Sequence, residues 1–173
     1  MNKSRNLAKV FLLTTLIFLC GCLMAQKIHP DILSKKWKAS WIEVPGESKD
    51  DYGVYKFRTT IELKERPATF IVHVSADNRY KLYVNEKEVS NGPARSDLSH
   101  YNFETVDIAS YLKPGENILG ALVWNFGEFR PEAQISYRTA FILQGDTPNE
   151  EIVNTGKNWK CIRDESYEPL NPV

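Results

Sequence analysis

The sequence predicts an all-β fold, an antiparallel β-sandwich of the jelly-roll type. About nine short stretches of strand length, either apolar or alternating, follow one another at close spacing. Clusters of Gly, Pro, Asn, Asp and Ser separate these stretches and are typical of turns. No amphipathic stretch has the length of an ordinary helix. This combination is typical of two packed antiparallel sheets that carry their polar chemistry on the loops at the strand ends.

The N-terminal half of the predicted domain contains two strands. Residues 37–42 place the aromatic rings of Trp37 and Trp41 at strand spacing, and a Pro-Gly turn follows them. Residues 52–63 form the longest candidate strand, because apolar or aromatic side chains alternate there with polar and charged ones. Such alternation indicates a sheet with one packed face and one solvated face.

Residues 70–126 organise the rest of the chain. The runs 71–74 and 82–84 are rich in β-branched, apolar and aromatic side chains and predict strands, with a polar turn between them. Residues 85–87 predict a tight hairpin turn, and an irregular loop over 91–97 follows.

The second part of this stretch ends in a buried strand. Extended structure resumes at Tyr101, and residues 106–112 predict a short helical or 3₁₀ cap with Asp107 as a candidate N-cap. Residues 118–124 read ILGALVW, a nearly continuous apolar run that predicts a strand in the middle of a sheet.

Further strands are expected at 135–143 and in a closing hairpin formed by 152–153 and 159–162. A length of 173 residues suits one domain better than two. The expected organisation is a targeting segment at 1–25, a tether at 26–36, a β-sandwich at 37–164, and a tail or the start of a following domain at 165–173.

The N-terminus has the pattern of an export signal. A basic stretch over residues 1–9 precedes an apolar run over 10–19 that is too short to span a bilayer. Two processing routes fit. The letters LCGC resemble a bacterial lipobox with the lipid on Cys22, whereas Met-Ala before Gln26 suits ordinary signal-peptidase cleavage. Both routes predict an exported protein in the periplasm, anchored to the outer membrane, or outside the cell.

Charge and cysteine content exclude several classes. Lys plus Arg and Asp plus Glu number 22 each, but three of the basic residues lie in the signal, which leaves 19 positive against 22 negative charges, or −3. A mildly acidic domain lacks the basic face that nucleic acid requires. Cys161 is the single thiol outside the signal, so no internal disulfide forms, and the alternation around it predicts a half-buried strand residue.

Hydrolase chemistry has little support in the sequence. No Gly-x-Ser-x-Gly motif is present, and His73 lies in an apolar strand, where a hydrogen-bonded structural histidine is expected. Acidic residues are numerous, but their spacing does not show that any two face each other as a glycosidase acid and base must. No catalytic residue is assigned.

Carbohydrate binding has better support, because sugars pack on aromatic rings while polar side chains bond to their hydroxyl groups. The loop after the ILGALVW strand supplies this mixture, and loops at strand ends carry function. The predicted contacts are Trp124, Asn125, Phe126, Glu128 and Arg130. The alternative is that Trp124 and Phe126 belong to the core and that Arg130 pairs with Glu128 or Glu132.

Calcium is the one cofactor that the sequence suggests. Asp77 and Asn78 supply hard oxygen ligands in a loop between strands, and Asp97 lies in a second irregular loop. The alternative is that these side chains bond to their own turns, as Asx residues often do.

The segment SADNRYKLYVNEKEV, followed by GPARSDLSHYNFETVDIASYLKPGENILGALVWN, resembles the N-terminal β-sandwich of bacterial α-L-rhamnosidases, including the Bacteroidetes-type secreted enzymes. The resemblance covers about residues 37–170. It implies a galactose-binding-domain-like jelly roll, which in that family precedes an (α/α)₆ barrel carrying the catalytic acids. The positions that match the family pattern are Asp77, Asn78, Arg79, Arg95, Asp97 and His100. Arg95, Asp97 and His100 thereby join the candidate sugar-binding or interface residues.

The 173 residues contain no such barrel, so the resemblance implies an accessory domain or a fragment of an α-L-rhamnosidase. One hypothesis is a carbohydrate-binding domain without catalysis, whose partner is a rhamnose-containing glycan. A second is a structural domain that docks on a catalytic barrel and binds no sugar. A third, a complete enzyme, requires that the chain itself hydrolyse rhamnosides.

Overall fold

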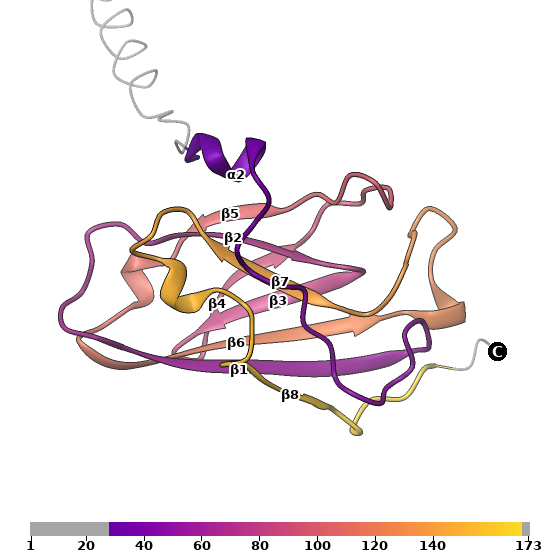
Figure 1. Cartoon of the computed structure of the whole chain (residues 1–173). Coiled ribbons are helices and arrows are strands. Elements are labelled where there is room, and N and C mark those ends of the chain that lie inside the picture. The colour runs from indigo at the N-terminus through magenta and orange to yellow at the C-terminus, as the bar shows by residue number, and fades with distance from the viewer. Residues whose placement is uncertain (1–27, 171–173) are drawn as a thin grey trace, which may run out of the picture.

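The computed structural model describes residues 28–170, which fold as two antiparallel β-sheets packed face to face (Figure 1). The larger sheet has the strand order β4-β3-β6-β1-β8, and the smaller has the order β5-β2-β7. The strands are β1 (Gly53–Leu63), β2 (Ile71–Ala76), β3 (Arg79–Val84), β4 (Lys87–Gly92), β5 (Glu104–Asp107), β6 (Gly115–Asn125), β7 (Phe141–Gly145) and β8 (Lys160–Arg163). The predicted antiparallel β-sandwich is confirmed.

Strands β1 and β6 form the centre of the larger sheet and pair in register along their whole length. Side chains along β1 alternate between buried and exposed from Tyr55 onward, as the sequence pattern predicts. Strand β6 lies between β1 and β3, so the predicted position of residues 118–124 inside a sheet is confirmed. The face of β6 turned away from the core is partly exposed, and it carries Ile118 and Leu122.

The core is built from the inner faces of both sheets. Phe141 of β7 is fully buried, and its ring contacts those of Phe57, Tyr80 and Trp159 at centroid distances of 5.6, 6.1 and 5.6 Å. Since Phe57 and Tyr80 come from the opposite sheet, this cluster joins the two layers. Edge-on and tilted aromatic contacts of this kind are favourable beyond the area they bury.

The predicted hairpin at 85–87 joins β3 to β4. Asn85 and Glu86 have φ angles of 47° and 69°. Two successive positive φ angles are the signature of a type I′ turn, whose twist matches that of the flanking strands.

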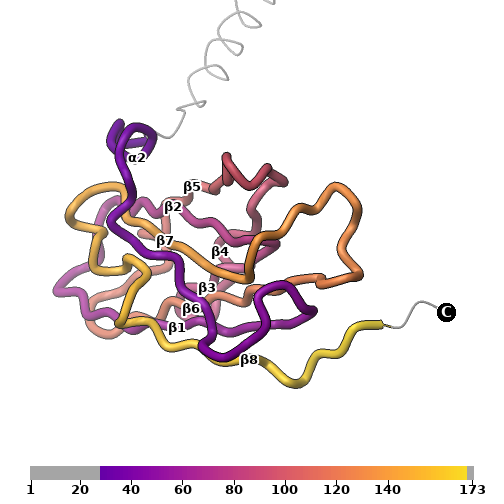
Figure 2. Tube along the Cα trace, turned by 45° about the vertical axis from the view of Figure 1, so that its right-hand side comes forward, coloured from indigo at the N-terminus to yellow at the C-terminus, as the bar shows by residue number. Residues whose placement is uncertain are grey.

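Residues 37–42 are not the predicted strand. Ile42 alone makes a β-bridge, to Phe141, while the backbone N–H groups of Ala39 and Ser40 donate to the side chain of Gln144 and to the carbonyl of Thr155. Because successive backbone groups of this segment bond to different elements, they do not form the continuous hydrogen-bond ladder of a strand. The predicted tether contains the short helix α2 (Pro30–Ser34) in place of the turn expected near His29. Both figures of the backbone show the segment after α2 passing in front of β7 (Figures 1 and 2).

Three further element predictions are corrected. The closing hairpin does not form: residues 152–153 lie in the 3₁₀ helix η3 (Glu151–Val153), and β8 pairs with β1. In the predicted strand 135–143, only the part from Phe141 onward is a strand. The 3₁₀ cap forms as the shorter helix η1 (Ala109–Tyr111), with the end of β5 before it and Ile108 at its N-cap position.

Asp107 nevertheless performs a capping role, since its Oδ1 accepts hydrogen bonds of 2.9 Å from the N–H groups of Phe70 and Ala109. One more 3₁₀ helix, η2 (Gly127–Phe129), follows β6. Within residues 28–170, no helix is long and apolar enough to cross a membrane. The predicted signal and the lipidation site at Cys22 lie outside the described residues.

Candidate functional site

Two adjoining pockets lie beside the smaller sheet, between the segment that follows α2 and the loop that precedes β5. The first, here called the Arg138 pocket, has a volume of about 410 Å³. It is lined by Trp41, Glu43, Asp77, Tyr101, Tyr137, Arg138 and Ala140. The second, here called the Phe103 pocket, has a volume of about 320 Å³. It is lined by Lys36, Trp37, Ala39, Trp41, Ser75, Tyr101, Phe103 and Ile142.

Aromatic rings dominate both walls. Trp41 contacts Tyr101 at a centroid distance of 5.3 Å, and Trp37 meets Phe103 edge-on at 5.2 Å. Trp41 is 44% exposed and Tyr137 is 69% exposed. Large aromatic side chains that stay accessible beside a hollow are candidates for ligand contact, because most such rings are buried to a greater extent.

The buried carboxylate of Asp77 holds the floor of the Arg138 pocket. It accepts hydrogen bonds from the Tyr101 hydroxyl at 2.8 Å and from the N–H groups of Tyr137 and Arg138 at 2.9 and 3.3 Å. The Ser136 hydroxyl donates to the same carboxylate. These bonds tie the turn between β2 and β3 to two loops that are distant in sequence, so the pocket walls are fixed before any ligand enters.

Burial, reinforced by the bond to Asp77, raises the pKa of Tyr101 well above its ordinary value. The hydroxyl therefore stays protonated and donates at all physiological pH values. Several donors converge on Asp77, and these hydrogen bonds stabilise a negative charge on its buried carboxylate.

The charged rim of the Arg138 pocket consists of an ion pair between Arg138 and Glu43. Both side chains are more than one third exposed, so they stay within reach of a ligand. The Nε atom of Arg138 is buried without a hydrogen-bond partner. A guanidinium and a carboxylate side by side supply both donors and acceptors, which is what the hydroxyl groups of a sugar require.

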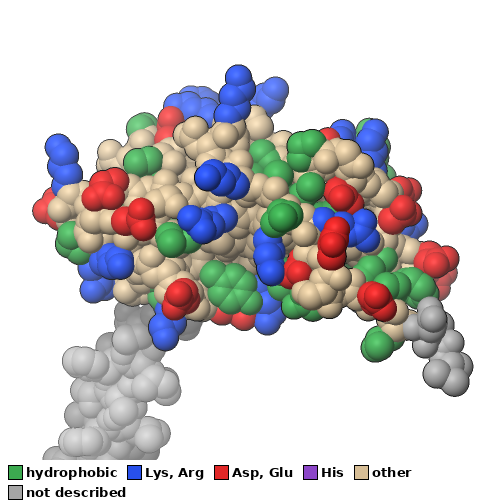
Figure 3. Space-filling model, turned by 90° about the horizontal axis from the view of Figure 1, so that it is seen from below, with side chains coloured by type: hydrophobic (Ala, Val, Ile, Leu, Met, Phe, Trp, Pro, Cys, Tyr) green, Lys and Arg blue, Asp and Glu red, His purple; other side chains and the backbone are tan. Residues whose placement is uncertain are grey.

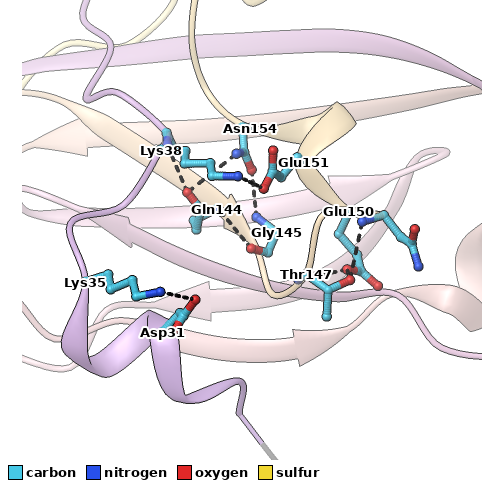
Figure 4. Close-up of polar contacts among 11 residues, drawn as sticks. Asp31, Lys35, Lys38, Gln144, Gly145, Thr147, Glu150, Glu151 and Asn154 are labelled. Carbon is cyan, nitrogen blue, oxygen red and sulfur yellow. Dashed lines mark hydrogen bonds and ion pairs between the residues drawn. The ribbon is translucent and has the colours of Figure 1, made fainter.

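Hydrogen bonds and an ion pair hold the segment that carries Trp37 and Trp41 against β7 and η3 (Figure 4). The Ala39 N–H donates to Gln144 Oε1 at 2.8 Å, and Lys38 pairs with Glu151 at 2.5 Å on the surface. The Trp37 indole N–H donates to the carbonyl of Ile32 at 3.0 Å. These contacts fix the backbone from which both Trp rings project.

A buried histidine supports the same region from behind. His73 bonds through Nδ1 to Thr105 and through Nε2 to Asp146, both at 2.9 Å, and its ring lies edge-on to Phe103 at 5.5 Å. Asp146 Oδ1 also accepts from the backbone N–H of His29, at the start of α2. His73 is therefore the hydrogen-bonded structural histidine that the sequence predicts.

The predicted contacts in the last two residues of β6 and in the loop after it do not line either pocket. Asn125 is fully buried, and its side chain bonds to Ser136, Thr139 and the N–H of Gly127. It fixes the loops and has no group left for a ligand. Trp124 and Phe126 are half-buried and meet edge-on at 6.4 Å, while Glu128 and Arg130 are exposed on η2 and just after it. A sugar contact through these four stays a prediction.

The second predicted set, in the loop before β5, also lies outside both pockets. Asp97 accepts from the N–H groups of Ser99 and His100 and contacts the His100 ring, all on the exposed surface. The bond from Ser99 and the contact with His100 lower the pKa of Asp97. Arg95 is exposed, and its carbonyl accepts from Asn102. The bonds that Asp97 accepts from the following backbone are those of an Asx turn.

The calcium prediction stays a prediction. Asp77 does line the Arg138 pocket, and Asn78 donates to Asp77 and accepts weakly from the Phe126 N–H at 3.4 Å. Calcium takes about six to eight oxygen ligands, so backbone carbonyls, water or a ligand would have to complete the set. Among residues 28–170, no cluster of three or more His, Cys, Asp or Glu side chains could hold a metal ion.

The sequence pattern does not bring together the residues that line the Arg138 pocket, because the pocket is assembled from four separate segments. The sequence pattern predicts one strand around Trp41 and another that contains Tyr137 and Arg138, and it marks Tyr101 only as the start of extended structure. The one signal in the sequence is Asp77, in a polar loop between two predicted strands.

The fold and the pocket define the class as an antiparallel β-sandwich module with an aromatic-lined pocket beside one sheet. Among solved structures, the chain is similar to the family GH78 rhamnosidase of Bacillus sp. GL1, with 27% identity and a TM-score of 0.67 over 75% of this chain. It is also similar in fold to the Streptomyces avermitilis α-L-rhamnosidase complexed with L-rhamnose (23% identity, TM-score 0.53, 77% of this chain). A lectin from Pleurotus ostreatus shares the fold at 20% identity and a TM-score of 0.51 over 77% of this chain.

The matched region is a small part of each enzyme, 14% of the Bacillus chain and 12% of the Streptomyces chain, and 37% of the lectin. No protein-family model and no curated protein matches the sequence. The resemblance to a β-sandwich domain of α-L-rhamnosidases, expected from the sequence, is confirmed, while the Bacteroidetes type stays a prediction. The chain therefore matches one region of those enzymes.

Proposed function

We propose that this chain is a non-catalytic carbohydrate-binding accessory domain of an α-L-rhamnosidase system. The observation that carries the proposal is the exposed ring of Trp41 beside a preformed pocket whose rim pairs Arg138 with Glu43. The similarity to a small part of a GH78 rhamnosidase supports the context. L-Rhamnose is a 6-deoxy sugar, so its methyl group suits an aromatic wall while its hydroxyl groups suit the charged rim.

The acidic residues of the pocket support the absence of catalysis. A glycosidase needs one carboxyl group as acid and a second as base or nucleophile across the scissile bond. Asp77 is buried and saturated by hydrogen-bond donors, and Glu43 is held by Arg138. Neither is placed to donate a proton to a leaving group. The purified chain is expected to leave aryl rhamnosides unhydrolysed.

A structural docking domain is the second candidate, and the outer face of the larger sheet favours it. This face has a hollow of about 510 Å³ lined in part by Tyr83, Ile118, Leu122 and Tyr167. Seen from below, exposed hydrophobic side chains lie there among Lys, Arg and acidic residues (Figure 3). A partner domain could cover this face without any sugar being bound.

Calorimetric titration of the full chain with L-rhamnose and rhamnosylated glycans separates the two candidates. Sugar binding predicts a saturable signal that Trp41→Ala weakens at least about tenfold, the effect of roughly 1.4 kcal/mol. The matched control is Tyr167→Ala, which removes an exposed aromatic in the segment after β8, away from both pockets, and should bind like the wild type. Absence of binding to every glycan would leave the docking candidate.

Export is the remaining part of the proposal and is supported by the basic and apolar pattern of residues 1–19. Mass spectrometry of the mature N-terminus distinguishes its two forms. A diacylglycerol-modified Cys22 indicates a lipoprotein, and an unmodified Gln26 indicates ordinary cleavage.

A further inference from the structure

We propose that the two pockets are consecutive subsites of one groove, so that the ligand is a glycan segment of at least two sugar residues. This inference rests on the proposed sugar-binding function. The Arg138 pocket takes one residue, and the Phe103 pocket takes its neighbour.

The first argument is that the pockets share a wall. Trp41 and Tyr101 line both of them, and their rings touch at a centroid distance of 5.3 Å. Each pocket, at about 410 and 320 Å³, has the volume of a small-molecule site by itself. A glycosidic linkage that passes over the shared wall would place one ring on either side of it.

The second argument is the difference in chemistry between the two pockets. The Arg138 pocket has the ion pair and therefore fixes the orientation of its sugar. The Phe103 pocket has Lys36 as its one charged lining residue, and its floor is formed by the buried side chains of Ser75 and Ile142. It suits the apolar face of a neutral sugar ring, whose hydroxyl groups would stay in solvent. The second subsite should therefore add affinity without strong selectivity.

The third argument is that the second subsite is also preformed. The Ser75 hydroxyl donates to the carbonyl of Asn102 at 2.7 Å and holds the loop that carries Phe103. On the opposite wall, the Trp37 indole is fixed by its bond to Ile32. Binding then needs little ordering of side chains, and this preserves affinity.

The test is a calorimetric titration of the full chain with L-rhamnose and with rutinose, a disaccharide of L-rhamnose and glucose. Rutinose should bind about tenfold more tightly than the monosaccharide, a gain of roughly 1.4 kcal/mol. Phe103→Ala should remove this gain and keep the affinity for L-rhamnose, which also shows that the variant is folded. Trp41→Ala should weaken both ligands.

A measurement on the unmodified protein makes the test independent of the variants. In nuclear magnetic resonance spectra, the indole N–H signal of Trp37 should shift with rutinose and stay in place with L-rhamnose. Equal affinity for both sugars, with binding still lost in Trp41→Ala, would overturn the groove and leave the proposed function intact. Binding of neither sugar would overturn both. A gain that survives Phe103→Ala would also contradict the second subsite.

Discussion

The hydroxyl of Tyr101 donates a hydrogen bond of 2.8 Å to the buried carboxylate of Asp77. The two residues are 24 positions apart, and their bond joins the turn between β2 and β3 to the loop before β5. This bond holds Tyr101, which forms one wall of the Arg138 pocket, against that turn.

Tyr101→Phe is expected to destabilise the protein by about 1–3 kcal/mol, because a buried charged acceptor loses one of its donors. Urea denaturation monitored by tryptophan fluorescence measures the change. Tyr111→Phe is the matched control, since Tyr111 is an exposed aromatic at the end of η1 away from the pocket. Equal midpoints for the two variants would show that the bond to Asp77 does not stabilise the fold.

Residues with an unambiguous local pattern allowed the sandwich to be predicted. The alternation of 52–63, the apolar run 118–124 and the turn at 85–87 each specify one local structure. The segments around Trp37 and Ile135 also carry apolar residues at strand spacing, but their hydrogen-bond partners are side chains and loops rather than a neighbouring strand. The periodicity of apolar residues indicates which side chains are buried, but it does not indicate which groups the backbone N–H and C=O bond to.

The candidate site was less predictable for a different reason. Asn125 stands in the sequence beside aromatic and charged residues at the end of a core strand, which predicts a ligand contact, yet its side chain bonds to the adjacent loops. Arg138 and Trp41 have no shared motif, and they meet only because Ile42 bridges to Phe141 three positions after Arg138. A site formed by distant loops has no signature in a single sequence.

The contacts that hold Lys38 and Ala39 against β7 and η3 give a second prediction. Gln144→Ala is expected to destabilise the protein by about 1–3 kcal/mol, because the buried N–H of Ala39 would lose its acceptor. Lys38→Ala removes a surface ion pair to Glu151 and should leave stability close to that of the wild type. Chemical denaturation of both variants is the measurement, and a larger loss for Lys38→Ala would reverse this assignment.

The hairpin between β3 and β4 offers a stabilising change. Glu86 has a φ of 69°, which is unfavourable for a residue with a Cβ atom, and the second position of a type I′ turn favours Gly. Glu86→Gly should raise the free energy of unfolding by about 0.5–1 kcal/mol.

Lys87→Gly is the control, because this neighbouring position is in β4, where Gly weakens the strand. Thermal unfolding of both variants is the measurement. A lower melting temperature for Glu86→Gly than for the wild type would contradict the assignment of strain to this residue.

His73 makes the stability of the fold depend on pH. Burial lowers the pKa of His73, and the opposing effect of the bond to Asp146 does not cancel it. The unfolded chain, in which the pKa of His is about 6.5, therefore binds a proton more readily than the folded protein does. The contribution of neutral His73 to the free energy of unfolding should be fully present above about pH 6.5. It should be lost as the pH falls from that value toward the lower pKa of the folded state.

His73→Gln should be less stable at neutral pH and should have a flatter dependence between about pH 5 and 7, because the titrating group is gone. His100→Gln serves as the control, since His100 lies on the surface against Asp97 alone, whereas His73 is enclosed by Thr105, Asp146 and the rings of Trp37 and Phe103. Urea unfolding at several pH values gives the slopes. If the free energy of unfolding had the same dependence on pH in His73→Gln and in the wild type, a group other than His73 would cause that dependence. The contact of α2 with Asp146 would then not depend on protonation of His73.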